Sequence, residues 1–212
     1  MIISVKLYGF EKQTTLNDLD KPMHVCCAAT FYGASLLYLP LNESITRLQL
    51  QFNFLTGRSG PLFSASGSVD FLYVDVTQSG RVVASVDLGA GRATVTSPPG
   101  ISTVADRRWH SVVVVLGRFD LQLILDDVFE SRATLPGDFM ALNVDVGLLL
   151  GVRFAEVPAA VSTESLPTMT FRGCLREVNF NGVDVLAAAR RTDTASQMTV
   201  VTWNRSEPKI IS

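Results

Sequence analysis

The chain has 212 residues, a formal net charge of −2, 47% hydrophobic residues and 18% charged residues. This composition supplies enough apolar side chains for a buried core and argues against a disordered chain. The slightly acidic balance argues against a general nucleic-acid binder, which would carry a clear basic excess. The sequence contains no apolar run of about 18 residues, so no membrane-spanning helix is expected.

Residues 1–27 are predicted to be a leader of uncertain status. Charged residues interrupt its apolar start before the core of a signal peptide can form. Yet Val25-Cys26-Cys27-Ala28-Ala29 is similar to the small-residue end of a signal peptide. Two interpretations stay open: an ordinary disordered leader, or the remnant of an export signal lost through a mis-assembled first exon.

From residue 30 to about residue 186 the pattern is that of successive β-strands. The clearest is 47–54, where leucine or phenylalanine alternates with polar residues, as in a half-buried antiparallel strand. Turn signals recur about every 8–12 residues, and no amphipathic helix is convincing. The expected strands are 35–41, 47–54, 61–65, 70–76, 81–88, 92–96, 109–116, 121–125, 147–152 and 171–180, the last closed by Asn181-Gly182.

This succession of strands predicts an all-β fold in which two antiparallel sheets form a sandwich. We expect one domain over residues 28–190, since sandwiches of about 170–200 residues are commonly single units. Residues 191–212 are expected to be an atypical, poorly ordered tail.

Four motifs occur in order along the chain. They are Trp109-His110-Ser111-Val112 preceded by Asp106, Leu123-Ile124-Leu125-Asp126, Gly147-Leu148-Leu149-Leu150-Gly151 with Val152 in place of a second glycine, and Phe171-Arg172-Gly173-Cys174-Leu175 leading to Asn181-Gly182. Each is weak alone, but the ordered set resembles the laminin G-like family. The segments 29–35, 39–41 and 48–52 are further similar to the N-terminal laminin G-like domain of transmembrane chondroitin sulfate proteoglycans.

The resemblance implies a jelly-roll sandwich of the concanavalin A-like type and a non-catalytic binding module outside the cell. Rim loops of such modules bind matrix proteins such as collagen or laminin, cell-surface receptors or sulfated glycans, sometimes through calcium. The chain is therefore expected to be a fragment of a secreted or membrane-anchored proteoglycan-like protein, next to a further laminin G-like domain. No nucleic-acid partner is expected.

Two acids are candidates for a calcium site, which needs hard oxygen ligands. Asp70 precedes a strand after a Ser-Gly-Ser loop, where laminin G-like domains often place a ligand. Asp145 lies before the strand at Gly147. The favoured interpretation is that both are ordinary solvated turn residues and that the domain has no cofactor.

Two pairs of arginines are candidates for a glycan or receptor patch. Arg107 and Arg108 lie at a turn, and Arg190 and Arg191 follow the last core strand. Their guanidinium groups could hold sulfates if the pairs converge. Ordinary surface charge is the favoured alternative, since the sequence does not fix the distance between the pairs.

Two sequons, at Asn42 and Asn204, are candidate glycosylation sites in an exported chain. In the laminin G-like family, the cysteine matching Cys174 pairs with one further along the chain, yet residues 192–212 contain none. A truncated gene or a pairing with Cys26 or Cys27 would explain this. We expect Cys174 to be a free thiol on a buried or half-buried strand.

Catalysis finds little support in the residue pattern. His24 and His110 are the two histidines, and neither spacing suggests a nucleophile–base pair or a zinc site. His110 is expected to pack on its sheet. The alternative function is a lectin-like or glycoside hydrolase sandwich, which would need paired carboxylates. The acids to inspect are Asp126 with Asp127 and Asp75 with Asp87, all expected to point outward and to be unpaired.

Overall fold

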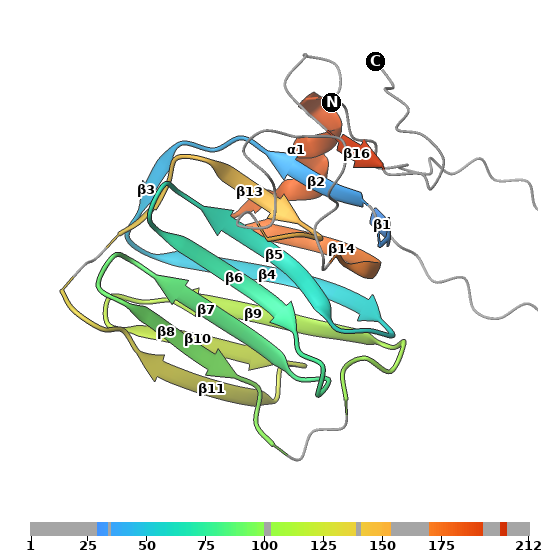
Figure 1. Ribbon diagram of the computed structural model, residues 1–212, viewed down its shortest axis with the longest axis horizontal. Helices are drawn as coiled ribbons and strands as arrows, with labels where there is room; N and C mark the ends of the chain where they lie inside the picture. The colour runs from blue at the N-terminus through green and yellow to red at the C-terminus, as the bar shows by residue number, and fades with distance from the viewer. Residues whose placement is uncertain are drawn as a thin grey trace, which may run out of the picture.

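The computed structural model describes residues 29–33, 35–99, 103–138, 141–153, 170–192 and 200–202. Two antiparallel sheets lie face to face, as Figure 1 shows, with β5–β8 in front of β4, β9 and β10. This arrangement confirms the predicted sandwich. Among the described residues, no helix is long and apolar enough to cross a membrane.

The first sheet has the strand order β1-β14-β4-β9-β10-β11, with β15 paired to β14. Its strands are β1 (Ala29–Tyr32), β14 (Arg172–Phe180), β4 (Leu48–Thr56), β9 (Trp109–Leu116), β10 (Asp120–Leu125), β11 (Phe129–Thr134) and β15 (Val183–Asp184). The second sheet has the order β16-β2-β13-β5-β6-β7-β8. Its strands are β16 (Val200–Thr202), β2 (Ser35–Leu39), β13 (Gly147–Leu150), β5 (Gly60–Ser66), β6 (Phe71–Val76), β7 (Val82–Asp87) and β8 (Arg92–Thr96). A short ribbon joins β3 (Glu43–Ile45) to β12 (Leu142–Val144).

The alternation on β4 creates one side of the core. Leu48, Leu50, Phe52 and Phe54 are each at most 2% exposed, while the intervening side chains lie on the outer face. Burial of one such side chain stabilises the fold by about 2–3 kcal/mol. The predicted inward face of this strand is therefore confirmed.

The closing strand β14 ends in the predicted Asn-Gly turn. Asn181 and Gly182 both have positive φ, 49° and 83°, as a tight type I′ hairpin turn requires. The β14–β4 register shifts between Arg176 and Asn179, and Glu177 has a φ of 54°. This bulge allows Leu175 and Val178 to face the core although they are three residues apart.

One helix, α1 (Val185–Thr192), corrects the expectation that the domain contains no helix. The Asp184 carboxylate accepts a hydrogen bond from the Ala187 backbone N–H at 2.9 Å, which caps the first turn. The alanine-rich sequence that follows favours a helix. Three residues of the predicted tail also form β16, paired with β2, and the rest of the tail lies outside the described residues.

The expected free thiol at Cys174 is wrong, because this cysteine is disulfide-bonded. It lies on β14 opposite Thr30 of β1 and is 9% exposed, as expected for a buried strand. The other two cysteines of the chain, Cys26 and Cys27, precede β1 by only a few residues and lie outside the described residues. Because Cys174 lies beside the N-terminal strand β1, the lack of a later cysteine does not prevent it from forming a disulfide.

Candidate functional site

The two candidate calcium ligands lie on neighbouring loops. The Asp70 carboxylate is 5% exposed and accepts hydrogen bonds from the backbone N–H and the side-chain amide of Asn143, both at 2.8 Å. Asp145 accepts hydrogen bonds from the Ser68 backbone N–H and hydroxyl, both at 2.6 Å. The hydroxyl hydrogen bond from Ser68 lowers the pKa of Asp145 below its usual value. Desolvation opposes this effect, and hydrogen bonds from the backbone N–H groups of Ser68 and Asp145 add to the lowering.

These contacts fit a loop junction better than a cation site. Both oxygens of Asp145 and one of Asp70 already accept hydrogen bonds from the chain. Among the described residues, no group of three or more histidine, cysteine or acidic side chains is placed to hold a metal. The two acids predicted for the rim are thus brought close to one another, but they hold the 67–70 loop against 143–145.

Asp75 and Asp87 are not placed as the paired carboxylates of a glycosidase. Asp75 lies opposite Val83 and Asp87 lies four residues further along β7, a separation of about 13 Å. The carboxyl groups of glycosidases are about 5–9.5 Å apart. Asp87 accepts hydrogen bonds from the backbone N–H groups of Gly89 and Gly91, at 2.9 and 3.2 Å, and so caps a turn.

Asp75 and Asp126 correct the expectation that these acids point outward and are unpaired. Asp75 is 5% exposed and receives two hydrogen bonds from Arg153, at 2.9 and 2.7 Å. Burial raises the pKa of Asp75, although Arg153 acts in the opposite direction. Asp126, directly after β10, lies 2.9 Å from His110 of the neighbouring strand β9, whereas Asp127 is exposed as expected.

Four arginines gather at the end of the sandwich where β4 ends. The buried Thr56 contacts three of them through their backbones: its hydroxyl accepts from the Arg58 N–H at 3.1 Å and donates to the Arg172 carbonyl at 2.9 Å. Its own carbonyl accepts from the Arg107 N–H at 2.8 Å, and Arg108 follows. All four arginines are exposed, and we call them the arginine rim.

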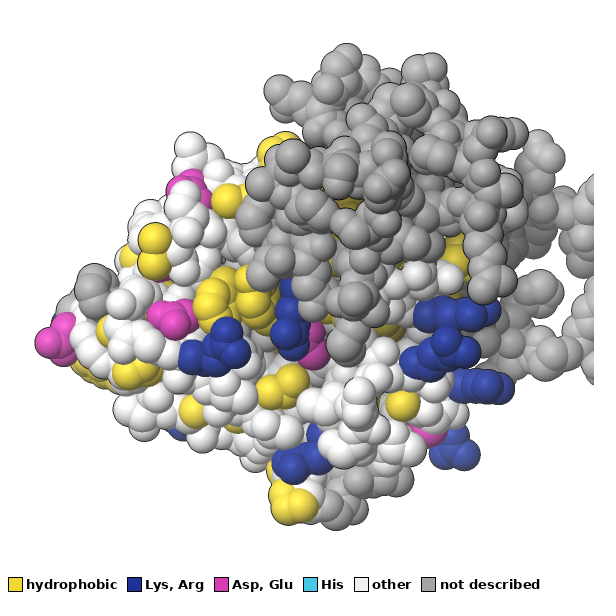
Figure 2. Space-filling view, in the orientation of Figure 1, with side chains coloured by type: hydrophobic (Ala, Val, Ile, Leu, Met, Phe, Trp, Pro, Cys, Tyr) yellow, Lys and Arg dark blue, Asp and Glu magenta, His cyan; other side chains and the backbone are white. Residues whose placement is uncertain are grey.

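The backbone of the arginine rim is tightly fitted. Arg107 has a φ of 65°, a conformation that costs energy for a residue other than glycine. Its side chain crosses Gly57 so closely that a Cβ there would lie 3.0 Å from the Arg107 Nε. Figure 2 shows Lys and Arg side chains gathered at the right-hand edge, where β4 ends in Figure 1. The four lysines of the chain lie outside the described residues, so every described cation of this kind is an arginine.

A fifth arginine extends the positive surface onto the outer face of the first sheet. The Arg176 guanidinium lies 4.2 Å from the centre of the Trp109 ring, in a cation–π contact. Its Nε is buried and has no hydrogen-bond partner among the described residues. Strand β9, which begins at Trp109 directly after Arg108, therefore connects the arginine rim to this face of the sheet.

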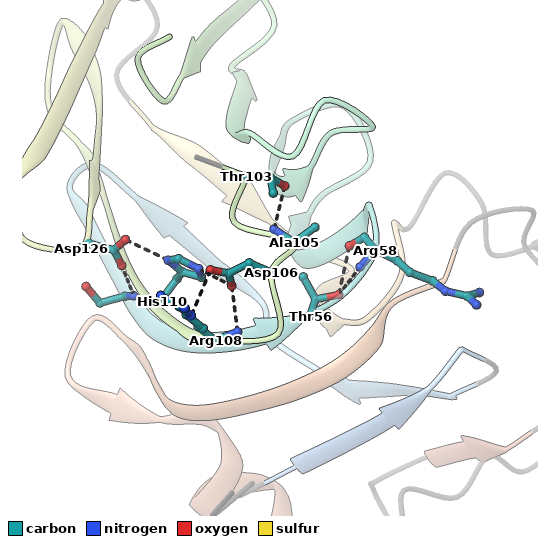
Figure 3. Close-up of polar contacts among 9 residues, drawn as sticks. Thr56, Arg58, Thr103, Ala105, Asp106, Arg108, His110 and Asp126 are labelled. Carbon is teal, nitrogen blue, oxygen red and sulfur yellow. Dashed lines mark hydrogen bonds and ion pairs between the residues drawn. The ribbon is translucent and has the colours of Figure 1, made fainter. Parts of the chain in front are cut away.

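His110 ties the arginine turn to the body of the domain (Figure 3). Its Nδ1 lies 2.9 Å from Asp126 Oδ2, and its Nε2 lies 3.1 Å from Asp106 Oδ1. The ring packs on Phe54 with 5.6 Å between ring centres, and the side chain is 13% exposed. Its expected packing on the sheet is confirmed. Asp126 Oδ1 also accepts from the Ser111 N–H at 2.9 Å.

Asp106 is the acid within this turn. Slight burial acts to raise its pKa, but hydrogen bonds from the Arg108 N–H and from His110, together with the electrostatic effect of these two side chains, bring it below the usual value. The Arg108 Nε lies 3.8 Å from Asp106, a loose ion pair. Arg108 thus keeps most of its side chain, 84%, exposed to a ligand.

The structure therefore changes which arginines belong to the predicted patch. Arg107 and Arg108 are joined by Arg58 and Arg172, which the sequence did not suggest. Arg190 and Arg191 belong to α1, but their side chains lie outside the described part of the chain, so their convergence with the other pair stays a prediction.

The two sequons lie in different parts of the chain. Asn42 is exposed in the connection between β2 and β3, where an exported chain could carry a glycan. Asn204 lies outside the described residues. Glycosylation at either position stays a prediction.

The sequence contained the signals for the missed contacts. In the β9–β10 hairpin Val112 is opposite Leu125, so the same register carries Asp126 to the level of Ser111, beside His110. Asp106 lies four residues before the histidine. Extending the hairpin register would have predicted a histidine between two carboxylates.

Comparisons with known proteins agree with this architecture. The laminin G domain family matches residues 54–183 of the chain. Rat chondroitin sulfate proteoglycan 4 is 28% identical over 159 residues, 74% of this chain and 7% of that protein. Human laminin subunit alpha-3 is 34% identical over 110 residues, 51% of this chain and 3% of that protein.

Solved structures show the same fold. The LG4-5 domains of the mouse laminin alpha1 chain superpose with a TM-score of 0.59 at 22% identity, covering 86% of this chain and 44% of that one. The chain spans only a small part of the curated relatives that it matches. With more than half of its residues matched by the family and the predicted resemblance confirmed, the chain belongs to the laminin G domain family.

Proposed function

We propose that this domain is a non-catalytic extracellular binding module whose arginine rim binds sulfated, polyanionic glycans. Laminin G domains are typically extracellular binding modules. The observation that carries the proposal is the gathering of four exposed arginines around the buried Thr56, with Asp106 as the acid among them. Arginine presents a planar fork of donors that matches a sulfate better than lysine does.

The fixed backbone of the rim supports recognition rather than loose attraction. Arg58, Arg107 and Arg172 come from three separate segments, and each is hydrogen-bonded to the same threonine. Because the backbones are already ordered, a ligand would need to order only the side chains. Matrix proteins such as collagen or laminin, and receptors that carry such glycans, are the proposed partners.

The cellular setting is part of the same proposal. Similarity to part of a chondroitin sulfate proteoglycan supports a place in the extracellular region of a membrane protein, or in a secreted one. An adjacent laminin G-like domain in the full-length protein would extend the binding surface.

Calorimetric titration with a heparin oligosaccharide tests the proposed function. We expect the Arg58→Ala/Arg107→Ala variant to bind about tenfold to a hundredfold more weakly, because two charge-assisted contacts are lost. The matched control is Arg47→Ala/Arg118→Ala, which removes two exposed arginines from a groove at the other end of β4 and β9. We expect the control to stay within about twofold of wild type; equal losses in both variants would contradict a defined rim site.

For the acidic loops we propose a structural role without calcium. The hydrogen bonds at Asp70 and Asp145 already join the two loops, so chelation with EGTA is expected to leave the melting temperature unchanged within about 1 °C. Added calcium at millimolar concentration is likewise expected to have no effect on Tm or on heparin affinity. A rise in Tm of several degrees with calcium would show that the carboxylates hold the ion, since a ligand of the native state stabilises it.

A further inference from the structure

We propose that His110 is a charge-dependent clamp that positions the arginine rim, so that affinity for a sulfated polyanion falls as His110 loses its proton. The inference rests on the proposed function and adds a regulation of the same site. His110 is a positioning residue, since it acts through the turn that carries Arg107 and Arg108.

The two ring nitrogens of His110 each face a carboxylate oxygen, at 2.9 Å from Asp126 and 3.1 Å from Asp106. A neutral imidazole has one N–H donor and one lone pair, whereas the imidazolium has two donors. Both contacts are therefore attractive only in the protonated ring, and in the neutral ring one lone pair faces an anionic oxygen.

The two carboxylates are not held equally. Asp126 is fixed independently of the histidine, because its Oδ1 accepts from the Ser111 N–H and its own N–H donates to the Ser111 carbonyl, both at 2.9 Å. Asp106 is exposed, lies further from the ring and is otherwise held by the Arg108 segment. Loss of the proton from Nε2 therefore breaks the contact between His110 and Asp106, whereas the contact between His110 and Asp126 remains.

Release of Asp106 acts directly on the arginine turn. The backbone N–H of Arg108 donates to Asp106 Oδ1 at 2.8 Å, on the same oxygen that faces His110. Arg107, between them, has the strained φ of 65° and donates its N–H to Thr56. A strained turn relaxes when the contact that maintains it is lost. Figure 3 shows Asp106 between His110 and Arg108, with Asp126 on the other side of the ring.

The charged groups on the elements around His110 are consistent with a ring that is held more firmly when it is protonated. The turn before β9 carries Asp106, Arg107 and Arg108, and the turn after β10 carries Asp126 and Asp127. β14 carries Arg172 of the arginine rim, Arg176, which is stacked on Trp109, and Glu177 at the bulge. β4 contributes Phe54 and no charge. The protonated ring thus lies between anions on two sides, and it adds one positive charge near the rim.

Heparin affinity at pH 5.5 and pH 8.0, at one salt concentration, tests the clamp, because histidine changes charge between about pH 5 and 8. Wild type is expected to bind about threefold to tenfold more weakly at pH 8.0. His110→Gln, which keeps an amide but cannot gain a proton, is expected to bind at both values as wild type does at pH 8.0. The matched control, His24→Gln, changes the other histidine and should keep the full pH dependence.

Hydrogen exchange gives a second measurement that does not require a ligand. Protection of the Arg107 and Arg108 amides, relative to amides of β6, is expected to fall between pH 5.5 and 8.0 in wild type. It should be low at both values in His110→Gln; if that variant fails to fold, the wild-type profile alone decides.

The two proposals fail in different ways. Binding of equal strength at both pH values, or a pH dependence that survives in His110→Gln, overturns the clamp and leaves the glycan site standing. Absence of heparin binding at either pH, with the expected change in amide protection, removes the proposed function while the ordering of the turn by His110 remains. Unchanged protection of the turn overturns the clamp in either case.

Discussion

Gly173→Ala is expected to lower the free energy of unfolding by at least about 3 kcal/mol. A Cβ at this position would overlap the Leu55 carbonyl oxygen and lie 2.8 Å from the Phe171 ring. Neither neighbour can move freely, since Leu55 belongs to the paired β4 strand and Phe171 is fully buried. The methyl group would force β14 away from β4 at the level of Thr56.

A glycine in the turn that follows the same strand provides the control. Gly182 has a φ of 83°, and a Cβ added there would meet no atom within 4 Å, so crowding does not arise. Gly182→Asn is expected to cost less than about 1 kcal/mol, because asparagine tolerates this backbone conformation. Urea denaturation followed by tryptophan fluorescence measures both variants. A Gly173→Ala loss no larger than that of Gly182→Asn would show that the strands do not approach as described.

Arg153→Ala is the second change with a large expected effect, a loss of about 2–3 kcal/mol at neutral pH. The Asp75 carboxylate is 5% exposed, and both of its oxygens accept hydrogen bonds from Arg153. Removal of one partner leaves a buried charge uncompensated. The expected loss lies just below the range for fully buried pairs because the Arg153 side chain is itself 39% exposed.

The loss at Arg153→Ala should depend on pH. Burial raises the pKa of Asp75 in the native state above its value of 3.8 in the unfolded chain. Protonation of Asp75 therefore stabilises the fold at pH values below 3.8, and this stabilisation is lost as the pH rises through the native pKa. Without Arg153 the pKa rises further. The loss in the free energy of unfolding of Arg153→Ala, relative to wild type, is thus expected to be smallest near about pH 4 and largest near about pH 7. Arg118→Ala, which removes an exposed cation from the Phe119 ring, should show a small, pH-independent change.

Much of the fold could be predicted because the long strands have strong periodicity. The alternation of Leu48, Leu50, Phe52 and Phe54 identifies both the strand and its buried face. The short elements could not be found in this way. β3 and β12 have three residues each and no readable period, and they form because they pair with one another across 99 positions of sequence.

The candidate site was less predictable than the fold, since it depends on which loops meet. Arg107 and Arg108 were identified as a pair at a turn, but Arg58 and Arg172 join them only because β4 lies between β9 and β14. The prediction for Asp75 was wrong for a related reason. A residue on a sheet's outer face becomes buried when another segment crosses it, here with Arg153 from beyond β13.

The slope of log affinity for a heparin oligosaccharide against log salt concentration tests the central claim most directly. Each cationic contact to a polyanion releases counterions and adds somewhat less than one unit to this slope. We predict that the slope falls by about one to two units in Arg58→Ala/Arg107→Ala and stays at the wild-type value in Arg47→Ala/Arg118→Ala. An unchanged slope in the rim variant, or an equal fall in both, would contradict a polyanion site at the arginine rim.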